Sequence, residues 1–352
     1  MSSKNKILIA PLNWGLGHAT RCIPIIKMLR IKGVDVQIAS DGDALLLLKG
    51  EFPNLTHWEL PSYKISYGSS FVWSMAKGLT NILKAVNEEK NTVAEIVAKE
   101  KITHIISDNR YGCHHPSTKN IFICHQQNLL MPKGMKFIES TINGLHKNFL
   151  KKFDTHWIPD TKEHDFAGKL SFTSFENSEF IGSLSRLEKM DIPTIYDVVA
   201  IISGPEPQRT FFFEKIKAQL IHSTLKSLII GGKISQKADK NEIINNCTIA
   251  QFMNTIELNQ TMAEAPVIVC RSGYSSIMDL AAMQKKAVLI PTPGQTEQIY
   301  LAERLHDLGI AFYEKQNNMN LSSAIENATK RSGFTTKKID NQHLETALNN
   351  LL

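Results

Sequence analysis

The sequence predicts an α/β protein of two Rossmann-like domains, and three observations support this prediction. Short apolar runs with the length of buried strands alternate with helical patterns, and turns rich in Gly, Ser and Pro follow the runs. A charged, proline-containing segment at residues 187–193 interrupts the alternation, which restarts at Asp197. The 352 residues suffice for two domains of about 150 residues each. We therefore expect an N-terminal domain over 1–185, a C-terminal domain over 186–330, a cleft between them, and a helix within 331–352 that packs back towards the N-terminal domain.

Composition places the chain among cytoplasmic proteins. Hydrophobic residues make up 42% of the sequence and charged residues 21%, which excludes a disordered chain. The net charge of +6 suits an anionic ligand. The five cysteines are odd in number and form no CxxC pair, so we expect reduced thiols. No apolar run reaches the roughly 18 residues of a membrane-spanning helix, and we expect at most a peripheral contact with the inner face of a membrane.

The first turn is rich in glycine but does not match the dinucleotide-binding pattern. A strand at residues 6–10 precedes this turn, and a helix at 22–32 with a second strand at 34–39 follows it. Gly15 and Gly17 supply two glycines of a G-x-G-x-x-G motif, but Thr20 stands in place of the third. We therefore expect no NAD and no other cofactor.

Two segments of the N-terminal half each allow two interpretations. Asp41 and Asp43 form a D-x-D pair that can hold Mg²⁺ against a diphosphate, but the favoured interpretation is a turn in which Asp43 caps the following helix. Between Phe71 and Leu83, aromatic and aliphatic residues alternate with lysines. This segment fits either a membrane-facing surface or a helix packed against the sheet.

Polar residues follow three of the predicted strands in this half. His18 follows the first strand, Asp108 follows the strand at 102–107, and His125 with Gln127 and Asn128 follows the strand at 120–124. Because the carboxyl ends of parallel strands lie along one edge of a sheet, we expect these side chains to converge. A carboxylate beside a histidine fixes the tautomer of the imidazole and raises its basicity.

The C-terminal half contains two strand–turn–helix units in succession. Strands at 266–270 and 287–290 lead into turns of small and polar residues, and each turn is followed by a helical pattern. Backbone N–H groups at helix N-termini bind anions, so these turns predict a site for a phosphorylated ligand. The candidate ligand-binding residues in these turns and in the turn after residue 202 are Gly204, Arg209, Arg271, Ser272, Gly273, Ser275 and Gln295.

These motifs resemble the GT-B glycosyltransferases, in particular the group that contains the N-acetylglucosaminyltransferase of lipid II assembly. The run from residue 269 to 273, followed by Asp279 and by Glu297 and Gln298, resembles the donor site of that group in order and spacing. Residues 15–18 and 125–128 stand where the group has its G-G-H and H-E-Q-N motifs, although Gln126 replaces the acid. The Gly-x-Gly-His-x-x-Arg form is also similar to a UDP-sugar hydrolase of pseudaminic acid biosynthesis.

The resemblance implies two Rossmann-like domains whose sheets face each other across a cleft, and it implies a role for each matching residue. Asp279 would hold the ribose hydroxyls of the nucleotide, Gln298 and Glu297 the donor sugar, and Ser272 and Gly273 the diphosphate. His18 and Asn128 would face the acceptor. Gly15, Gly17, His125 and Gln127 belong to the same acceptor-side motifs.

The leading hypothesis is an inverting, metal-independent glycosyltransferase that uses a nucleotide-sugar donor, most simply a UDP-sugar. His18 would act as the general base and Asp108 would orient it. A cell-envelope glycan or a lipid-linked sugar is the expected acceptor. A UDP-sugar hydrolase, with water as acceptor, and a non-enzymatic nucleotide-sugar sensor are the alternatives. Nucleic acid is not an expected partner, because Lys and Arg are dispersed along the chain.

Overall fold

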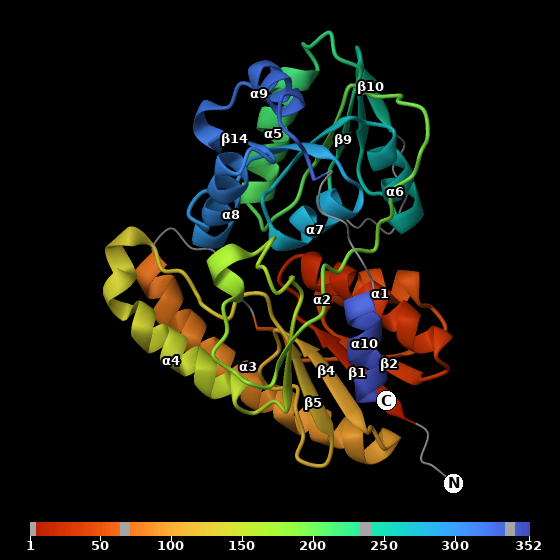
Figure 1. Ribbon diagram of the computed structural model, residues 1–352, viewed down its shortest axis with the longest axis vertical. Helices are drawn as coiled ribbons and strands as arrows, with labels where there is room; N and C mark the ends of the chain where they lie inside the picture. Colours follow the sequence, from red (N-terminus) through yellow and green to blue (C-terminus); the bar gives the residue numbers. More distant parts are fainter. Residues whose placement is uncertain (1–4, 64–70, 233–240, 335–341) are drawn as a thin grey trace. The chain divides into compact units, whose positions relative to one another are not determined.

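The computed structural model describes residues 5–63, 71–232, 241–334 and 342–352. The chain divides into unit 1, formed by Met1–Leu184 and Asp340–Leu352, and unit 2, formed by Ser185–Ile339. The predicted boundary between residues 185 and 186 lies one residue from this division. The predicted C-terminal helix belongs to unit 1, where it lies beside the first helix of the chain (Figure 1).

Unit 1 is a seven-stranded parallel sheet in the order β3-β2-β1-β4-β5-β6-β7, with helices between its strands. β1 is buried on both faces, as Ile7, Leu8 and Ile9 have no exposed surface. Each such side chain contributes about 1.5–3 kcal/mol relative to an exposed one. The elements are β1 Lys6–Pro11, α1 Gly17–Ile31, β2 Asp35–Ser40, α2 Gly42–Glu51, β3 Thr56–Glu59, α3 Phe71–Glu100, β4 His104–Asp108, β5 Lys119–Ile123, η1 Lys133–Ile138, α4 Glu139–Leu150, β6 Thr155–Ile158, η2 Gly168–Ser171, β7 Ser178–Phe180 and α10 Gln342–Leu351.

Unit 2 is also a seven-stranded sheet, in the order β10-β11-β9-β8-β12-β13-β14. All neighbouring strands are parallel except β10, which pairs antiparallel with β11. The elements are β8 Val198–Ile201, α5 Gln208–Leu220, β9 Ser227–Ile230, β10 Glu242–Ile244, β11 Cys247–Ala250, α6 Thr255–Ala263, β12 Val267–Cys270, α7 Tyr274–Ala282, β13 Lys286–Leu289, α8 Thr296–Asp307, β14 Phe312–Tyr313, η3 Gln316–Asn318 and α9 Leu321–Thr329.

Both sheets contain a point at which the strand order reverses. In unit 1 it lies between β1 and β4, and in unit 2 between β8 and β12. Ligands of open α/β sheets bind beside the carboxyl ends of the strands at such points. The two positions are therefore where the functional residues of each unit are to be sought.

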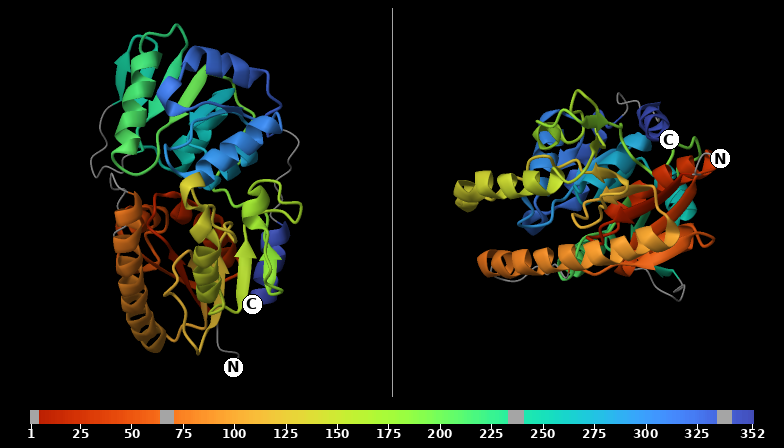
Figure 2. Two further views of the ribbon diagram at one scale, coloured as in Figure 1. Left: turned by 90° about the vertical axis from the view of Figure 1, so that its left-hand side faces the viewer. Right: turned by 90° about the horizontal axis from the view of Figure 1, so that it is seen from below.

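The predicted α/β class is confirmed, and the structure adds details that the sequence did not signal. The segment between residues 71 and 100 is one uninterrupted helix, α3, as Figure 2 shows. The side chains of residues 71–82 lie outside the described part, so the two interpretations of Phe71 to Leu83 stay open. The 3₁₀ helix η1 leads directly into α4. All five cysteines are buried as thiols, as expected from the sequence.

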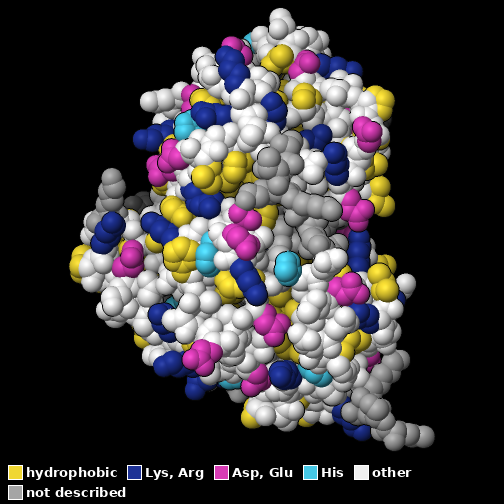
Figure 3. All heavy atoms as spheres, in the orientation of Figure 1, with side chains coloured by type: hydrophobic (Ala, Val, Ile, Leu, Met, Phe, Trp, Pro, Cys, Tyr) yellow, Lys and Arg dark blue, Asp and Glu magenta, His cyan; other side chains and the backbone are white. Residues whose placement is uncertain are grey.

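Charges of both signs are mixed on the face of the molecule that Figure 3 draws. On the face drawn in Figure 3, lysine and arginine side chains alternate with acidic ones and do not form one continuous patch. Among the described helices, none combines the length and the apolar composition needed to cross a bilayer.

Candidate functional site

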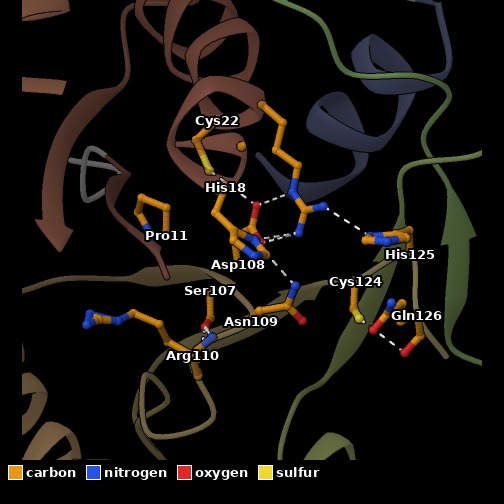
Figure 4. A network of polar contacts seen from close by, with 12 residues as sticks. Pro11, His18, Cys22, Ser107, Asp108, Asn109, Arg110, Cys124, His125 and Gln126 are labelled. Atoms are coloured by element: carbon orange, nitrogen blue, oxygen red, sulfur yellow. Dashed lines mark hydrogen bonds and ion pairs between the residues drawn. The ribbon is translucent and has the colours of Figure 1, made fainter. Parts of the chain in front are cut away.

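His18 and Asp108 meet at the point in unit 1 where the strand order reverses. His18 is the second residue of α1, and Asp108 is the last residue of β4, where it pairs in register with Pro11 of β1. His18 Nδ1 lies 2.7 Å from Asp108 Oδ1, as Figure 4 shows. The structure therefore brings together the two residues predicted to be catalytic, although 90 residues separate them in the sequence.

Arg21 completes this site, and the sequence analysis did not assign it a role. Its guanidinium binds both oxygens of Asp108 through Nε and Nη2, and its side chain is almost completely buried. Arg21 and Cys22 follow His18 by three and four residues, so all three project from the same face of α1 towards Asp108. The i, i+3, i+4 spacing of His18, Arg21 and Cys22 is the sequence signal from which a role for Arg21 in this site could have been predicted.

The ionisation of His18 differs from the prediction. Burial lowers its pKa, and the positive charge of Arg21 acts in the same direction, while Asp108 acts against both. Burial alone would raise the pKa of Asp108, but Arg21 and His18 hold it at about 2. Asp108 therefore raises the pKa of His18, as expected, but burial and the charge of Arg21 outweigh this effect, so the pKa is lowered overall. A lowered pKa favours the neutral imidazole, the form that can accept a proton.

The loop after β5 contributes His125 to the site, but it uses Gln127 and Asn128 differently from the prediction. His125 Nδ1 lies 3.2 Å from Arg21 Nη1. Gln127 is only 2% exposed and donates from Nε2 to the Cys124 carbonyl. Asn128 donates from Nδ2 to the Phe172 carbonyl at 2.6 Å. Gln127 is thus too buried to touch an acceptor, and Asn128 anchors the segment around Phe172.

The two glycines before His18 shape the turn. Gly15 has a φ of +76°, which favours glycine, and Gly17 is the first residue of α1. Asn109, directly after Asp108, also has a positive φ of +59°. A non-glycine residue in this conformation beside a candidate catalytic carboxylate is typical of a functional site.

Asp41 belongs to a second buried ionic cluster, separate from His18. The Arg110 side chain points away from Asp108 in Figure 4; its Nη2 lies 2.5 Å from Asp41 Oδ1 and its Nε 2.9 Å from Glu89 Oε1. Burial raises the pKa of Glu89 to about 7, although Arg110 and the hydroxyl of Tyr63 act against this. Asp41 also accepts from Asn13 and is the N-cap residue of α2. The predicted cap, Asp43, instead lies in the first turn of α2.

In unit 2, Gln298 joins the turns after β12 and β13. The Ser272 hydroxyl donates to the Gln298 carbonyl at 2.7 Å, and the Thr292 N–H donates to the Gln298 side-chain oxygen at 2.8 Å. Gln298 Nε2 lies 4.0 Å from the position that a Cβ on Gly273 would take. Gly273 is the N-cap residue of α7 and provides no side-chain cap, so the first turn of that helix retains donors for an anion.

Asp279 is held by a residue at the beginning of unit 2. It lies on α7, and its Oδ1 accepts a 2.6 Å hydrogen bond from the Ser185 hydroxyl. Burial raises its pKa to about 6, while the charge of Arg186 and the Ser185 hydroxyl act against this. Ser185 and Arg186 are therefore parts of the Asp279 environment that the sequence analysis missed.

Both arginines predicted to bind the donor are engaged within the protein. Arg271 is 1% exposed and donates to the carbonyls of Ile290, Pro291 and Gln208. Arg209 binds Glu206 and the Gly232 carbonyl. We correct both assignments: Arg271 fixes the loops around β12 and β13, and Arg209 neutralises a neighbouring carboxylate.

The remaining predicted residues lie near these turns. Ser275 is half-buried in the first turn of α7, Gln295 is the N-cap residue of α8, and Glu297 lies in the first turn of α8. Gly204, with a φ of +111°, faces Thr292, whose hydroxyl would lie 3.8 Å from a Cβ placed on Gly204. That hydroxyl is buried and has no hydrogen-bond partner within the described ranges, so Thr292 is a polar group for a ligand that the sequence analysis missed.

Comparison with known proteins agrees with this arrangement. Residues 208–349 match the model of the glycosyltransferase family 28 C-terminal domain. A UDP-N-acetylglucosamine--N-acetylmuramyl-(pentapeptide) pyrophosphoryl-undecaprenol N-acetylglucosamine transferase of Wolbachia pipientis is 24% identical over 56% of the chain, and the match spans 55% of that relative. The chain thus spans about half the length of this relative.

Solved structures share the fold over almost the whole chain. MurG of Acinetobacter baumannii has a TM-score of 0.58 at 13% identity, covering 98% of this chain and 99% of its own. The glycosyltransferase SnogD of Streptomyces nogalater has a TM-score of 0.62 at 11% identity, covering 99% and 100%. At this identity the likeness establishes the fold alone.

Two Rossmann-like units, each with polar residues where its strand order reverses, define a GT-B fold protein related to glycosyltransferases. Its C-terminal part matches the glycosyltransferase family 28 C-terminal domain, and the chain is similar to the lipid II-type N-acetylglucosaminyltransferases.

Proposed function

We propose that this protein transfers a sugar from a nucleotide-sugar donor, a UDP-sugar in the first instance, to a hydroxyl group, with inversion at the anomeric carbon and without a metal ion. The acceptor class that we propose is a cell-envelope glycan or a lipid-linked sugar. The observation that carries the proposal is the contact of His18 with Asp108 at the strand-order reversal, in a chain whose residues 208–349 match the model of the family 28 C-terminal domain.

The chemistry follows from the orientation of His18. We assign the Nδ1 proton to the 2.7 Å contact with Asp108, so that Nε2 carries the lone pair. As the acceptor oxygen forms its bond to the anomeric carbon, Nε2 takes the hydroxyl proton. The bond between that carbon and the phosphate oxygen breaks on the opposite face, and the electron pair leaves with the nucleoside diphosphate. General-base assistance of this kind accelerates a reaction by roughly 10²- to 10⁴-fold.

Unit 2 offers groups that stabilise the departing diphosphate. The first turns of α7 and α8 present backbone N–H groups, and the Thr292 hydroxyl lies beside Gly204.

In unit 1, Asp41 is already paired with Arg110 and Asn13. This pairing supports a metal-independent reaction. We therefore expect full activity in EDTA, and complete loss that Mg²⁺ restores would revive Asp41 and Asp43 as ligands.

The test of the function is a thermal-shift screen against UDP-, GDP-, ADP- and dTDP-sugars, followed by mass spectrometry of the products with cell extract as the acceptor source. We expect a stabilising nucleotide sugar and a new glycosylated product. Free sugar released from that donor at many turnovers per second without any acceptor would instead identify a hydrolase. Stabilisation without consumption of the donor by any acceptor would identify a sensor.

Peripheral contact with an anionic membrane is a further part of the proposal. Phe137 is 82% and Leu145 42% exposed, and both lie near lysines of η1 and α4. We expect the protein to co-sediment with vesicles containing anionic lipid and the Phe137→Glu variant to bind them more weakly. Equal recovery of both proteins with anionic and with neutral vesicles would contradict this contact.

A further inference from the structure

Arg21 links every charged group of the candidate catalytic site. It binds both oxygens of Asp108, its Nη2 lies 3.0 Å from His18 Nδ1, and its Nη1 lies 3.2 Å from His125 Nδ1. Asp108 and Arg21 are buried, and His18 is 15% exposed. One guanidinium thus connects α1, the end of β4 and the loop after β5.

These contacts assign the proton positions on both histidines. A guanidinium only donates hydrogen bonds, so His125 Nδ1 accepts from Arg21 and a neutral His125 carries its proton on Nε2. His18 Nδ1 faces both Asp108 Oδ1, which only accepts, and Arg21 Nη2, which only donates; because the Asp108 contact is the shorter, at 2.7 Å against 3.0 Å, we assign the Nδ1 proton to it and the lone pair to Nε2. The two rings are therefore held in opposite tautomers.

The charges act on His18 in opposite directions. An aspartate alone beside a buried histidine forms an ion pair with the imidazolium and favours the protonated, inactive base. Here Arg21 takes both oxygens of that aspartate, and its own positive charge lies close to the ring. His125 and the thiols of Cys22 and Cys124 are further titratable groups that face this site. An imidazolium would be a second positive charge beside one carboxylate.

We propose that Arg21 is a positioning residue that keeps His18 unprotonated on Nε2 by taking both oxygens of Asp108. Asp108 then orients the ring without protonating it. This role deepens the proposed function, since it explains how the base is available at neutral pH. It also stands apart from that function, because the protonation of His18 can be measured without any substrate.

The test is the NMR titration of histidine-labelled protein, with His18 assigned from the His18→Asn variant. We expect Arg21→Met to raise the proton affinity of His18 at least tenfold, because Asp108 would then be left to His18 alone. The acid limb of kcat/KM should move to higher pH by the same amount, so that activity lost at neutral pH returns in alkaline buffer. Arg30→Met, which removes an exposed arginine from the same helix, is the control and should leave the titration unchanged.

Three further variants keep the proposal falsifiable if Arg21→Met fails to fold. Arg21→Lys retains the charge but not the two-atom contact and should give an intermediate titration. Asp108→Asn leaves Arg21 beside the ring and should lower the proton affinity of His18 below that of the wild type. The double variant Arg21→Met/Asp108→Asn should return towards the wild type. A His18 titration that is unchanged in folded Arg21→Met or in Arg21→Lys would overturn the proposal, whereas the expected titrations without any sugar transfer would overturn only the proposed function.

Discussion

His18→Ala is expected to lower kcat by roughly 10²- to 10⁴-fold while the affinity for the nucleotide stays close to that of the wild type. In the described His18–Asp108–Arg21–His125 cluster, the imidazole of His18 contacts Asp108, and burial lowers its pKa, which favours the unprotonated form that accepts a proton. The predicted nucleotide ligands belong to unit 2, so removal of the ring should not weaken their contacts. Single-turnover rates and nucleotide titrations by calorimetry measure the two quantities separately.

His343→Ala provides a matched control for this variant. His343 is exposed on α10, so the substitution removes a histidine without touching the cluster, and activity should remain unchanged. In His18→Ala itself, Asp108 keeps its two contacts with Arg21, and the fold should persist. A His18→Ala protein with wild-type kcat would refute the assignment of His18 as the base.

The fold could be predicted from the sequence because parallel strands buried on both faces leave continuous apolar runs. The run that forms β1 is such a case, since all its central residues are buried. β10 could not be predicted in this way. It is three residues long at the edge of the sheet, and two of those residues, Glu242 and Ile243, are exposed, so neither apolar continuity nor alternation marks it.

The sequence predicted which residues of the site would lie together, but it did not predict how their charges affect the pKa of His18. Strand ends predicted that His18 and Asp108 would meet, because this follows from parallel topology alone. The role of Arg21 depends on a carboxylate 87 residues away, and an arginine in a helix is ordinarily a surface residue. Asp108 raises the pKa of His18 as expected, but burial and the charge of Arg21, which the sequence did not indicate, outweigh it. The role of Arg271 could not be predicted from the sequence either, because its partners are backbone carbonyls and no sequence motif indicates such contacts.

Asp279→Ala is expected to weaken binding of a UDP-sugar by roughly 10- to 150-fold, because a hydrogen bond to a charged group contributes about 1.5–3 kcal/mol. The proposed partners of Asp279 are the ribose hydroxyls. Comparison of UDP with 2′-deoxy-UDP isolates this contact. The wild type should prefer UDP, and Asp279→Ala should bind the two nucleotides equally. Asp307→Ala, which removes an exposed carboxylate at the end of α8, should behave like the wild type.

The pH dependence of nucleotide binding tests the same carboxylate without a substitution. Burial raises the pKa of Asp279 to about 6, so the residue is ionised above that pH and protonated below it. The ionised form accepts hydrogen bonds from hydroxyl groups on both oxygens, whereas the protonated form loses part of this capacity. Affinity for UDP should therefore fall as the pH drops through about 6, and this step should disappear in Asp279→Asn. Ser185→Ala removes the hydroxyl that favours the ionised form, so it should move the step to higher pH. If the step persists in Asp279→Asn, another group controls nucleotide binding and the ribose assignment fails.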